Sequence, residues 1–240
     1  MSEVALDVVG VRKVYGRVVA LDRVDLVVPA GTFVGLIGHN GAGKSTLLSL
    51  LTGQQRPTEG QVRIAGVDVH AQPREALARL GAVPEHPALF EHLSAREMLA
   101  FAAEVRGSEG VEAALDLTEL GADADRPIRE YSQGMRRKTA LAMALLGDPP
   151  VIVLDEAING LDPPSAARIK KELRRRVDAG ATVLLSTHVV ETVAAVADRV
   201  VMLAHGRVVA DVRTTDLGPG ALEALFLERL EAERDGGSAG

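Results

Sequence analysis

The chain has 240 residues, of which 47% are hydrophobic and 25% are charged, and its formal net charge is −6. This composition supports a globular fold with a substantial core and excludes collagenous and wholly disordered proteins. The absence of cysteine excludes disulfide scaffolds, thiolate metal sites and thiol nucleophiles. A negative balance also argues against a general nucleic-acid surface, because binding to phosphate backbones requires clustered positive charge. No nucleic-acid partner is therefore expected.

The chain lacks the sequence signals of a membrane-spanning or secreted protein. No apolar run approaches the roughly 18 to 20 residues that a membrane-spanning helix needs. Residues 1–7 contain acidic side chains where a secretory signal has basic ones, and no long apolar segment follows. These features predict a cytoplasmic location.

The first part of the chain is rich in predicted strands. Residues 4–9, 24–28 and 32–37 contain many β-branched side chains, and Gly16 and residues 29–31 separate them. The third run ends in glycines and meets residues 44–51, whose composition suits a helix. This order predicts a strand, a glycine-rich loop and a helix. A further short β segment is expected at residues 60–66.

The middle of the chain, from about residue 86 to 146, has the pattern of helices. Ser94 is followed three residues later by Glu97, which fits a capping box at a helix start. Apolar residues then recur at helical spacing at Met98, Leu99, Ala102 and Val105. No strong strand signal interrupts this region.

After residue 150, fully apolar runs alternate with a helix. Residues 151–154 and 181–186 are continuous apolar segments, and an amphipathic helix with Ile169, Leu173 and Val177 lies between them. Such alternation is typical of a buried parallel sheet. Residues 199–203 and 207–210 predict a hairpin.

Two basic clusters and one apolar stripe complete this pattern. Residues 136–138 and 174–176 are basic and lie beside acidic residues, so we expect solvated helix faces there. Near the C-terminus, one helical face carries Leu222, Leu225, Phe226 and Leu230. We expect this face to pack on its own domain.

The most specific motif starts at Gly38 and ends at Ser45, and it fits G-x-x-x-x-G-K-[ST]. The residue frequencies of this chain give on the order of 0.004 chance matches over its length. In such a loop the glycines let backbone N–H groups surround an anion at a helix N-terminus. Lys44 then neutralises the β- and γ-phosphates, and the Ser45 hydroxyl is available to Mg²⁺. The predicted nucleotide-binding residues of the loop are Gly38, His39, Asn40, Gly41, Ala42, Gly43, Lys44, Ser45 and Thr46.

Two acidic residues follow the apolar run at 151–154. Asp155 stands at the end of this strand, where a magnesium nucleotide site requires a carboxylate. Glu156 could orient or deprotonate the attacking water. An Asp-Glu pair after a strand is more often a cap for the next turn. Combined with the phosphate loop, the catalytic interpretation is the favoured one.

Further segments occur in a fixed order around the phosphate loop: Tyr15, Tyr-Ser-Gln-Gly-Met at 131–135, Leu-Asp-Glu at 154–156, Asn-Gly-Leu-Asp at 159–162 and Ser-Thr-His at 186–188. Together they resemble the ATP-binding subunit of ABC transporters over about residues 4 to 212. The resemblance implies an α/β fold: a P-loop NTPase core with a mainly parallel sheet, an N-terminal antiparallel β subdomain and an inserted helical subdomain. The ATPase domain would span residues 1–212, with the helical subdomain at about 86–146. Residues 213–240 would form a C-terminal helix and a flexible tail.

The resemblance also implies roles for residues outside the loop. Tyr15 would stack on adenine, Asp162 would lie at a dimer seam, and His188 would contact the γ-phosphate. In this family two subunits meet head to tail, so each ATP also contacts the signature segment of the other subunit. That segment here is Ser132, Gln133, Gly134 and Met135, with Ser132 and Gly134 meeting the γ-phosphate. Without the family order, Tyr15 and His188 would be interpreted as ordinary packing and loop residues.

The chain departs from the usual family pattern at several positions. The signature keeps only the Ser and the second Gly of Leu-Ser-Gly-Gly-Gln. Glu85 stands where most of the family has glutamine, and its carboxylate could still bind magnesium or a water of its shell. Residues 157–158 are Ala-Ile in place of the common Pro-Thr. Glu85 and this signature together resemble an exporter subgroup whose permeases are separate polytopic membrane proteins.

The sequence thus predicts an ATPase that uses ATP and Mg²⁺. Its catalytic residues would be Lys44, Glu156 and His188, and its magnesium-side residues Ser45, Glu85 and Asp155. A second copy, or a homologous subunit, would close on it around two ATP molecules. Hydrolysis would then move a polytopic permease docked near residues 85–100, with the chain peripheral on the inner face of the cell membrane.

Two alternatives remain open. A soluble ABC ATPase of repair, translation or cluster assembly is the first, although those that act on DNA carry long coiled coils and translation types carry two ATPase cores. A P-loop kinase is the second. It would need an acceptor pocket and a lid, and it would not explain residues 131–135, Asp162 and His188 together.

Overall fold

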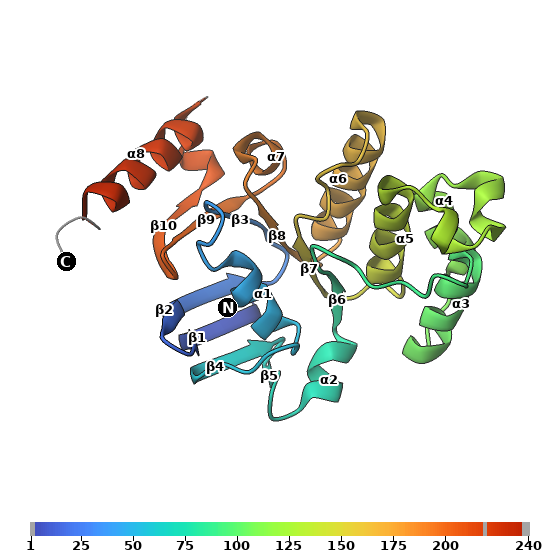
Figure 1. Cartoon of the computed structure of the whole chain (residues 1–240), viewed down its shortest axis with the longest axis horizontal. Coiled ribbons are helices and arrows are strands. Elements are labelled where there is room, and N and C mark those ends of the chain that lie inside the picture. Colours follow the sequence, from blue (N-terminus) through green and yellow to red (C-terminus); the bar gives the residue numbers. More distant parts are fainter. Residues whose placement is uncertain (1–2, 218–219, 237–240) are drawn as a thin grey trace.

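The computed structural model describes residues 3–217 and 220–236 and contains two sheets and a group of helices (Figure 1). The first sheet is antiparallel, with strand order β2-β1-β4-β5. Its strands are β1 (Val4–Tyr15), β2 (Val18–Pro29), β4 (Glu59–Ile64) and β5 (Val67–Asp68). This confirms the antiparallel N-terminal sheet.

β1 is longer than the predicted strand at residues 4–9. It continues past Gly10, where the pairing with β2 shifts register between Val8 and Val11. Gly10 adopts a φ of 55°, and its N–H donates to Asp25 Oδ1 at 2.7 Å. A bulge with an external acceptor lets the strand absorb one irregular residue without ending.

The second sheet has the order β10-β9-β3-β8-β7-β6, and only the β9–β10 hairpin is antiparallel. The hairpin and the parallel core were both expected from the sequence, and both are confirmed. Every residue of β3, β7 and β8 is buried, which explains why their central residues are apolar. The strands are β3 (Phe33–Ile37), β6 (Leu80–Val83), β7 (Val151–Asp155), β8 (Thr182–Thr187), β9 (Arg199–Ala204) and β10 (Arg207–Arg213).

Two hydrophobic cores cover the two faces of the second sheet. Val34 and Leu36 of β3 pack with α1 and the first sheet, whereas Phe33 and Ile37 pack toward α6 and α7. This alternation follows from the twofold periodicity of a strand. The helices outside the helical region are α1 (Lys44–Leu51), α2 (Pro73–Ala78), α6 (Pro163–Asp178), α7 (Val190–Ala194) and α8 (Ala221–Gly236).

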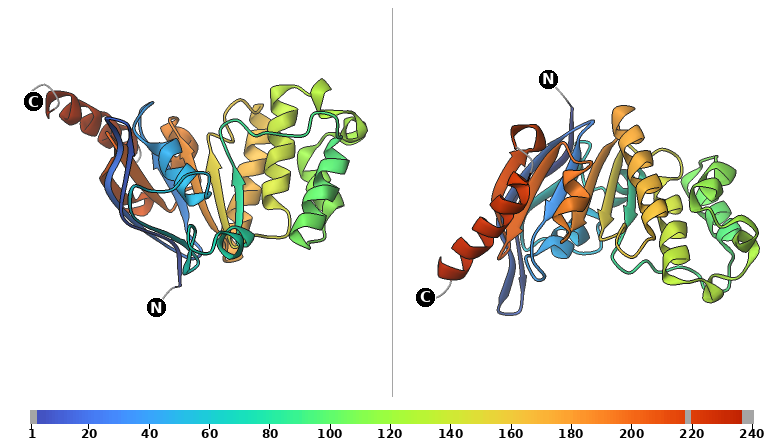
Figure 2. Two further views of the ribbon diagram at one scale, coloured as in Figure 1. Left: turned by 60° about the horizontal axis from the view of Figure 1, so that its bottom comes forward. Right: turned by 90° about the horizontal axis from the view of Figure 1, so that it is seen from above.

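A third core belongs to a helical region at one end of the molecule (Figure 2). The predicted capping box is confirmed, because Ser94 Oγ accepts the Glu97 N–H at 3.2 Å and Glu97 Oε2 accepts the Ser94 N–H at 2.8 Å. The first helix begins at Ala95, directly after its cap at Ser94, so the helices start later than the expected boundary at about residue 86. The elements are α3 (Ala95–Arg106), α4 (Val111–Thr118), η1 (Gly121–Asp125), η2 (Ile128–Glu130) and α5 (Gln133–Leu145).

The C-terminal helix packs on its own chain at the opposite end of the molecule (Figure 1). Leu222 is buried in the core that contains α7, and Leu225 and Phe226 pack against the same core. This confirms the predicted packing for these three residues, whereas the Leu230 side chain and the expected tail at 237–240 lie outside the described residues. Among the described helices, none has the length and apolar character to cross a membrane.

Candidate active site

The phosphate loop connects β3 to α1 in the middle of the second sheet. Gly43 has a φ of 105°, and a Cβ there would lie 2.7 Å from the Ala20 carbonyl oxygen. At Gly38 a Cβ would clash with the Leu203 carbonyl oxygen. The Gly206 N–H donates to the Ala42 carbonyl at 2.9 Å and ties the β9–β10 turn to the loop. Close backbone approach therefore requires glycine at positions 38 and 43, in addition to the requirement of the anion site.

Lys44, the first residue of α1, lies under the loop and is only 6% exposed. Its Nζ donates to the carbonyl oxygens of Gly38 at 2.8 Å and His39 at 3.3 Å. Burial lowers the pKa of Lys44, and the negative charges of Glu156, Asp155 and Glu85 oppose this effect. The three acids that the sequence singled out therefore lie close enough to Lys44 to affect its protonation.

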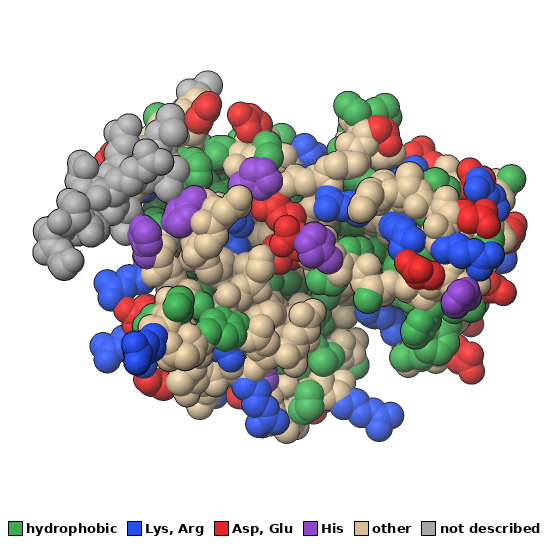
Figure 3. Space-filling model, viewed as in Figure 1, with side chains coloured by type: hydrophobic (Ala, Val, Ile, Leu, Met, Phe, Trp, Pro, Cys, Tyr) green, Lys and Arg blue, Asp and Glu red, His purple; other side chains and the backbone are tan. Residues whose placement is uncertain are grey.

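Sheet topology brings these residues together. The strand order β3-β8-β7-β6 is parallel, so the carboxyl ends of these strands meet at one edge. That edge carries in turn the phosphate loop, residues 186–188, residues 155–156 and Glu85. Ligands of open α/β sheets bind beyond the carboxyl ends of the strands. The space-filling view shows the result as a red acidic group near the middle of this face, with purple histidines on either side (Figure 3).

Asp155 is held in place by the neighbouring strand. It pairs with Ser186 in the β7–β8 register, and the buried Ser186 hydroxyl donates to Asp155 Oδ1. Among the described residues, no group of three or more His, Cys, Asp or Glu side chains could hold a metal ion alone. The Ser45 hydroxyl and the Asp155 carboxylate fit Mg²⁺ that arrives with a nucleotide, since Mg²⁺ commonly uses one or two carboxylates plus substrate phosphates.

Glu156 follows β7 in a left-handed backbone conformation with a φ of 50°. Its N–H donates to the Ser186 carbonyl at 3.2 Å, which anchors the residue to β8. Its buried carboxylate has a partner on each oxygen: His188 Nδ1 lies 3.0 Å from Oε1, and Asn159 Nδ2 donates to Oε2. The structure thus places Glu156 and His188 in contact.

Arg137 of α5 is a residue whose position the sequence did not predict. Its Nη1 donates to the Glu156 carbonyl at 3.3 Å, so the expected solvated face is wrong at this position. Residues 136–138 follow the signature segment directly, and the turn of α5 aims Arg137 at the strand edge. No sequence pattern signals this contact, because it joins residues 19 positions apart through packing.

The signature segment opens α5. Ser132 Oγ caps the helix by accepting the Met135 N–H at 3.2 Å, and both Ser132 and Gln133 are exposed. Tyr131, by contrast, is buried, and its hydroxyl donates to the Asp123 carbonyl at 2.7 Å. The start of α5 therefore faces outward, while Tyr131 anchors it to the helical region. Gln133 also lines a surface hollow of about 380 Å³ with Glu85, His86, Pro87, Glu91, Arg136 and Arg137.

Tyr15 and Asp162 lie on separate elements near this face. Tyr15 ends β1 and is 42% exposed, with Lys13 Nζ 5.0 Å from its ring centroid and its hydroxyl donating to Gln55. Asp162 caps α6, because its Oδ1 accepts the Ser165 N–H at 2.9 Å. This bond lowers the pKa of Asp162. The roles of both residues toward a nucleotide stay predictions.

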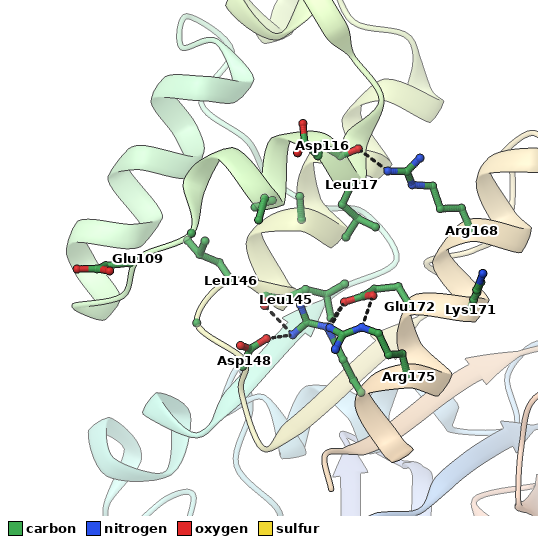
Figure 4. Close-up of a pocket in the computed structure, with 16 residues that line it drawn as sticks. Glu109, Asp116, Leu117, Leu145, Leu146, Asp148, Arg168, Lys171, Glu172 and Arg175 are labelled. Atoms are coloured by element: carbon green, nitrogen blue, oxygen red, sulfur yellow. Dashed lines mark hydrogen bonds and ion pairs between the residues drawn. The ribbon is translucent and has the colours of Figure 1, made fainter. Parts of the chain in front are cut away.

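Another hollow, of about 550 Å³, lies between α4, α5 and α6 (Figure 4). The arginines that line it are paired with acidic residues. Arg176 of α6 donates to the Leu145 carbonyl at 2.9 Å and forms ion pairs with Asp148 and Glu172, both at 2.8 Å. The Arg176 side chain is 13% exposed, so the expected solvated face at residues 174–176 is wrong there. Arg168 likewise joins α6 to α4 through Glu119 at 2.8 Å and the Asp116 carbonyl at 2.9 Å.

Comparison with known proteins agrees with the geometry of the strand edge. The family model described as ABC transporter matches residues 21–159. This chain belongs to the ABC transporter family. It is an ATP-hydrolysing subunit of that family.

Relatives of known function point in the same direction. The Nod factor export ATP-binding protein I of Sinorhizobium fredii is 37% identical over 218 residues, which cover 88% of this chain and 64% of that protein. The daunorubicin/doxorubicin resistance ATP-binding protein DrrA of Streptomyces peucetius is 36% identical, over 96% of this chain and 74% of that protein. The ABC ATPase described here therefore spans about two thirds to three quarters of the length of these two relatives.

Solved structures share the fold over nearly the whole chain. The structure of an ATP-binding subunit of an ABC transporter superposes with a TM-score of 0.86 at 30% identity and covers 93% of this chain and 98% of that one. A dimeric ATP-binding cassette in a post-hydrolysis state, bound to ADP and Pi, gives a TM-score of 0.77 at 27% identity, over 87% of this chain and 98% of that one. The P-loop NTPase fold expected from the sequence is thus confirmed.

Proposed function

We propose that this ABC ATPase drives export through a separate membrane permease by closing head to tail with a second ATPase subunit around two Mg·ATP molecules. The observation that carries the proposal is that the signature residues Ser132 and Gln133 are exposed at the start of α5, where a second subunit can reach them. Lys44, Asp155 and Glu156 converge at the strand edge, whereas Ser132 lies at the exposed start of α5. Two copies arranged head to tail supply each nucleotide with both halves.

The first half-site binds the triphosphate. The loop N–H groups and the start of α1 surround the β- and γ-phosphates, and Lys44 exchanges its bonds to the Gly38 and His39 carbonyls for phosphate oxygens. Ser45, Asp155 and Glu85 are the residues that would hold Mg²⁺. When bound, the ion neutralises charge on the phosphate oxygens. Tyr15 supplies an exposed ring for the adenine.

The hydrolytic step depends on Glu156 and His188. Glu156 orients the attacking water and accepts its proton, a function that suits a carboxylate beside the triphosphate site. His188 holds one oxygen of this carboxylate, and its side chain is 56% exposed, so its ring is accessible to a nucleotide. Both residues follow neighbouring parallel strands, so the sheet fixes their separation.

The second half-site is the start of α5. This helix has 13 residues, and its N-terminal N–H groups give it a positive end that favours an anion. Ser132 and Gly134 would meet the γ-phosphate held by the other subunit, with Gln133 and Met135 beside them and Asp162 at the seam. The partner is a second copy or a homologous subunit.

The permease would dock on the helical end of the molecule. Phe90 and Phe101 are both exposed, and their rings meet edge to face with centroids 5.9 Å apart. Val105, on the same helix as Phe101, is also exposed. Figure 3 shows a hydrophobic group in this part of the face. Exposed aromatic pairs of this kind suit a helix of a partner protein, and they lie within or next to the predicted docking segment at 85–100. The chain would therefore lie peripherally on the inner face of the membrane.

The experiment that tests the dimer mechanism uses Glu156→Gln. This variant should bind Mg·ATP and dimerise without turnover, because the amide keeps the shape of the carboxylate and cannot accept the proton. Size-exclusion chromatography with light scattering measures the mass with and without Mg·ATP. A variant that stays monomeric at saturating Mg·ATP would contradict the head-to-tail mechanism.

Capture of the partner tests the transport role. The same variant, purified with Mg·ATP from detergent-solubilised membranes of its native cell, should retain a polytopic membrane protein in stoichiometric amount, identified by mass spectrometry. Recovery of soluble proteins alone, from a preparation shown to bind ATP, would favour an ABC ATPase uncoupled from transport.

A further inference from the structure

The Glu156 carboxylate is held from two sides by different segments of the chain. His188, after β8, contacts Oε1 at 3.0 Å, and Asn159, in the turn after β7, donates its side-chain amide to Oε2. The sequence comparison gave His188 a role toward phosphate and gave Asn159 none. Asn159 is half-buried, three residues after Glu156, and its amide is directed back at the carboxylate.

The turn itself does not need this amide. The Asn159 N–H donates to the Glu156 carbonyl at 3.2 Å, and the Leu161 N–H donates to the Ile158 carbonyl at 3.4 Å. Ala157 and Ile158 are buried in the core beneath the turn, and Arg137 holds the Glu156 carbonyl from α5. Backbone bonds, packing and Arg137 therefore maintain the turn, and the side-chain amide of Asn159 contributes the orientation of the carboxylate.

A second donor matters because one donor leaves the carboxylate free to rotate. The terminal torsion of a glutamate side chain is broad, so a bond from His188 alone fixes one oxygen and not the plane of the group. Donors on both oxygens select one plane. An amide N–H also has no proton to lose near neutral pH, so it orients Glu156 without competing for the proton of the attacking water.

We propose that Asn159 is a positioning residue for ATP hydrolysis, which holds Oε2 of Glu156 while His188 holds Oε1, so that the carboxylate meets the attacking water in one orientation. The proposal rests on the proposed role of Glu156 as the residue that orients and deprotonates this water. Small displacements of a reacting group lower turnover strongly, by up to about 100-fold. Substrate binding depends on other residues, namely the phosphate loop and Tyr15.

The test compares Asn159→Ala and Asn159→Asp with the native chain. Asn159→Ala should lower kcat about tenfold or more and change KM for ATP less than about twofold. Asn159→Asp keeps the shape of the side chain but places an acceptor against Oε2, so its kcat should fall at least as far. If either variant fails to fold, judged by circular dichroism and the melting temperature, the other still decides the question.

Gln72→Ala is the matched control. Gln72 Nε2 donates to Glu75 Oε2 at 3.1 Å, an exposed amide–carboxylate pair that is also three residues apart, at the start of α2. Its removal should leave kcat unchanged. Native kcat in both Asn159 variants, or a loss that appears in KM or in ATP-dependent dimerisation while kcat stays native, would overturn the positioning role.

Glu156→Gln separates the inference from the function on which it rests. If Glu156→Gln retains native turnover, the proposed role of Glu156 is wrong. If Glu156→Gln is inactive and the Asn159 variants have native kcat, only the inference about Asn159 is wrong.

Discussion

Charged side chains cluster in two regions of this ABC ATPase, the strand edge and the hollow between α4, α5 and α6. The basic residues of the two regions have different kinds of partner. At the strand edge, Lys44 donates to the loop carbonyls of Gly38 and His39, although Asp155, Glu156 and Glu85 are close enough to affect its pKa. In the hollow between α4, α5 and α6, Arg176 instead meets two carboxylates and a carbonyl (Figure 4).

The type of partner determines whether a basic residue can bind a ligand or stabilises the fold. A cation that is held by neutral carbonyls, with acids nearby that it does not contact, can exchange its partners for a ligand. A cation whose donors already meet carboxylates stabilises the contact between elements and has little left to offer. Removing a charge at the strand edge should therefore lower ATPase activity and leave the free energy of unfolding unchanged. Removing a charge in the hollow should lower the free energy of unfolding and leave activity unchanged.

The largest effect is expected for Lys44→Met, which keeps the bulk of the side chain and removes its charge. ATP hydrolysis should fall about 100-fold or more in kcat/KM, because one charged donor to the phosphates is lost. The free energy of unfolding should not decrease, since burial already disfavours the charged form of Lys44. Steady-state ATPase assays and urea unfolding measure the two quantities. Lys171→Met, at an exposed position of α6, is the control. A large loss of stability in Lys44→Met would remove the contrast between the two regions.

Arg176→Ala should show the reverse behaviour. The free energy of unfolding should fall by about 2–3 kcal/mol, because Glu172 and the Leu145 carbonyl lose a charged donor. Turnover per folded molecule should remain near the native value. Arg175→Ala is the matched control: the Arg175 side chain is 62% exposed and pairs with the same Glu172, so its loss should cost less than about 1 kcal/mol. Equal costs in urea unfolding would show that burial of Arg176 is unimportant.

Tyr131→Phe sharpens the comparison within the helical region. The hydroxyl is part-buried and donates to the Asp123 carbonyl, so its removal should lower the free energy of unfolding by about 1 kcal/mol. Tyr15→Phe removes the other tyrosine hydroxyl of the chain from an exposed site, and no measurable change in stability is expected. Thermal unfolding of both variants provides the measurement. Equal shifts for the two would contradict the anchoring role of Tyr131.

The smallest effect concerns pH. Hydrogen bonds from Arg175 and Arg176 lower the pKa of Glu172 from its ordinary value near 4.5, against the opposing effect of burial. Because the folded pKa is the lower one, this carboxylate stabilises the fold above pH about 4.5 and loses that contribution as the pH falls through the folded pKa. Glu172→Gln should therefore be less stable than the native chain at pH 7, by about 1 kcal/mol, and the difference should shrink in acid.

Urea unfolding from pH 7 to pH 3 measures this difference. Asp178→Asn is the control, because its side chain is 64% exposed in its pair with Arg174 and little change is expected at any pH. A stability difference for Glu172→Gln that grows toward pH 3 would contradict the sign of the pKa change.

Much of the fold could be predicted from local patterns. The capping box at Ser94, the phosphate loop, the buried strands at 151–154 and 181–186 and the hairpin at 199–210 each depend on neighbouring residues, and the structure confirms them. β6 was missed, because Leu80–Val83 is a short edge strand that includes a glycine. The continuation of β1 past Gly10 was also missed, since it depends on an acceptor, Asp25, on the adjacent strand.

Some features of the candidate site could likewise be predicted from the sequence, and others could not. Motif spacing named Lys44, Asp155 and Glu156, because phosphate, magnesium and water each require particular residue types at strand ends, and the family resemblance added His188. The strand order decided that these residues meet at one edge, since sequence spacing does not specify which parallel strands are neighbours. Tertiary packing alone placed Arg137 on the Glu156 carbonyl and Arg176 in the hollow, where the sequence predicted solvated faces. Helix periodicity gives the direction of a side chain relative to its own helix, and only the packed neighbours determine whether it meets solvent or a partner.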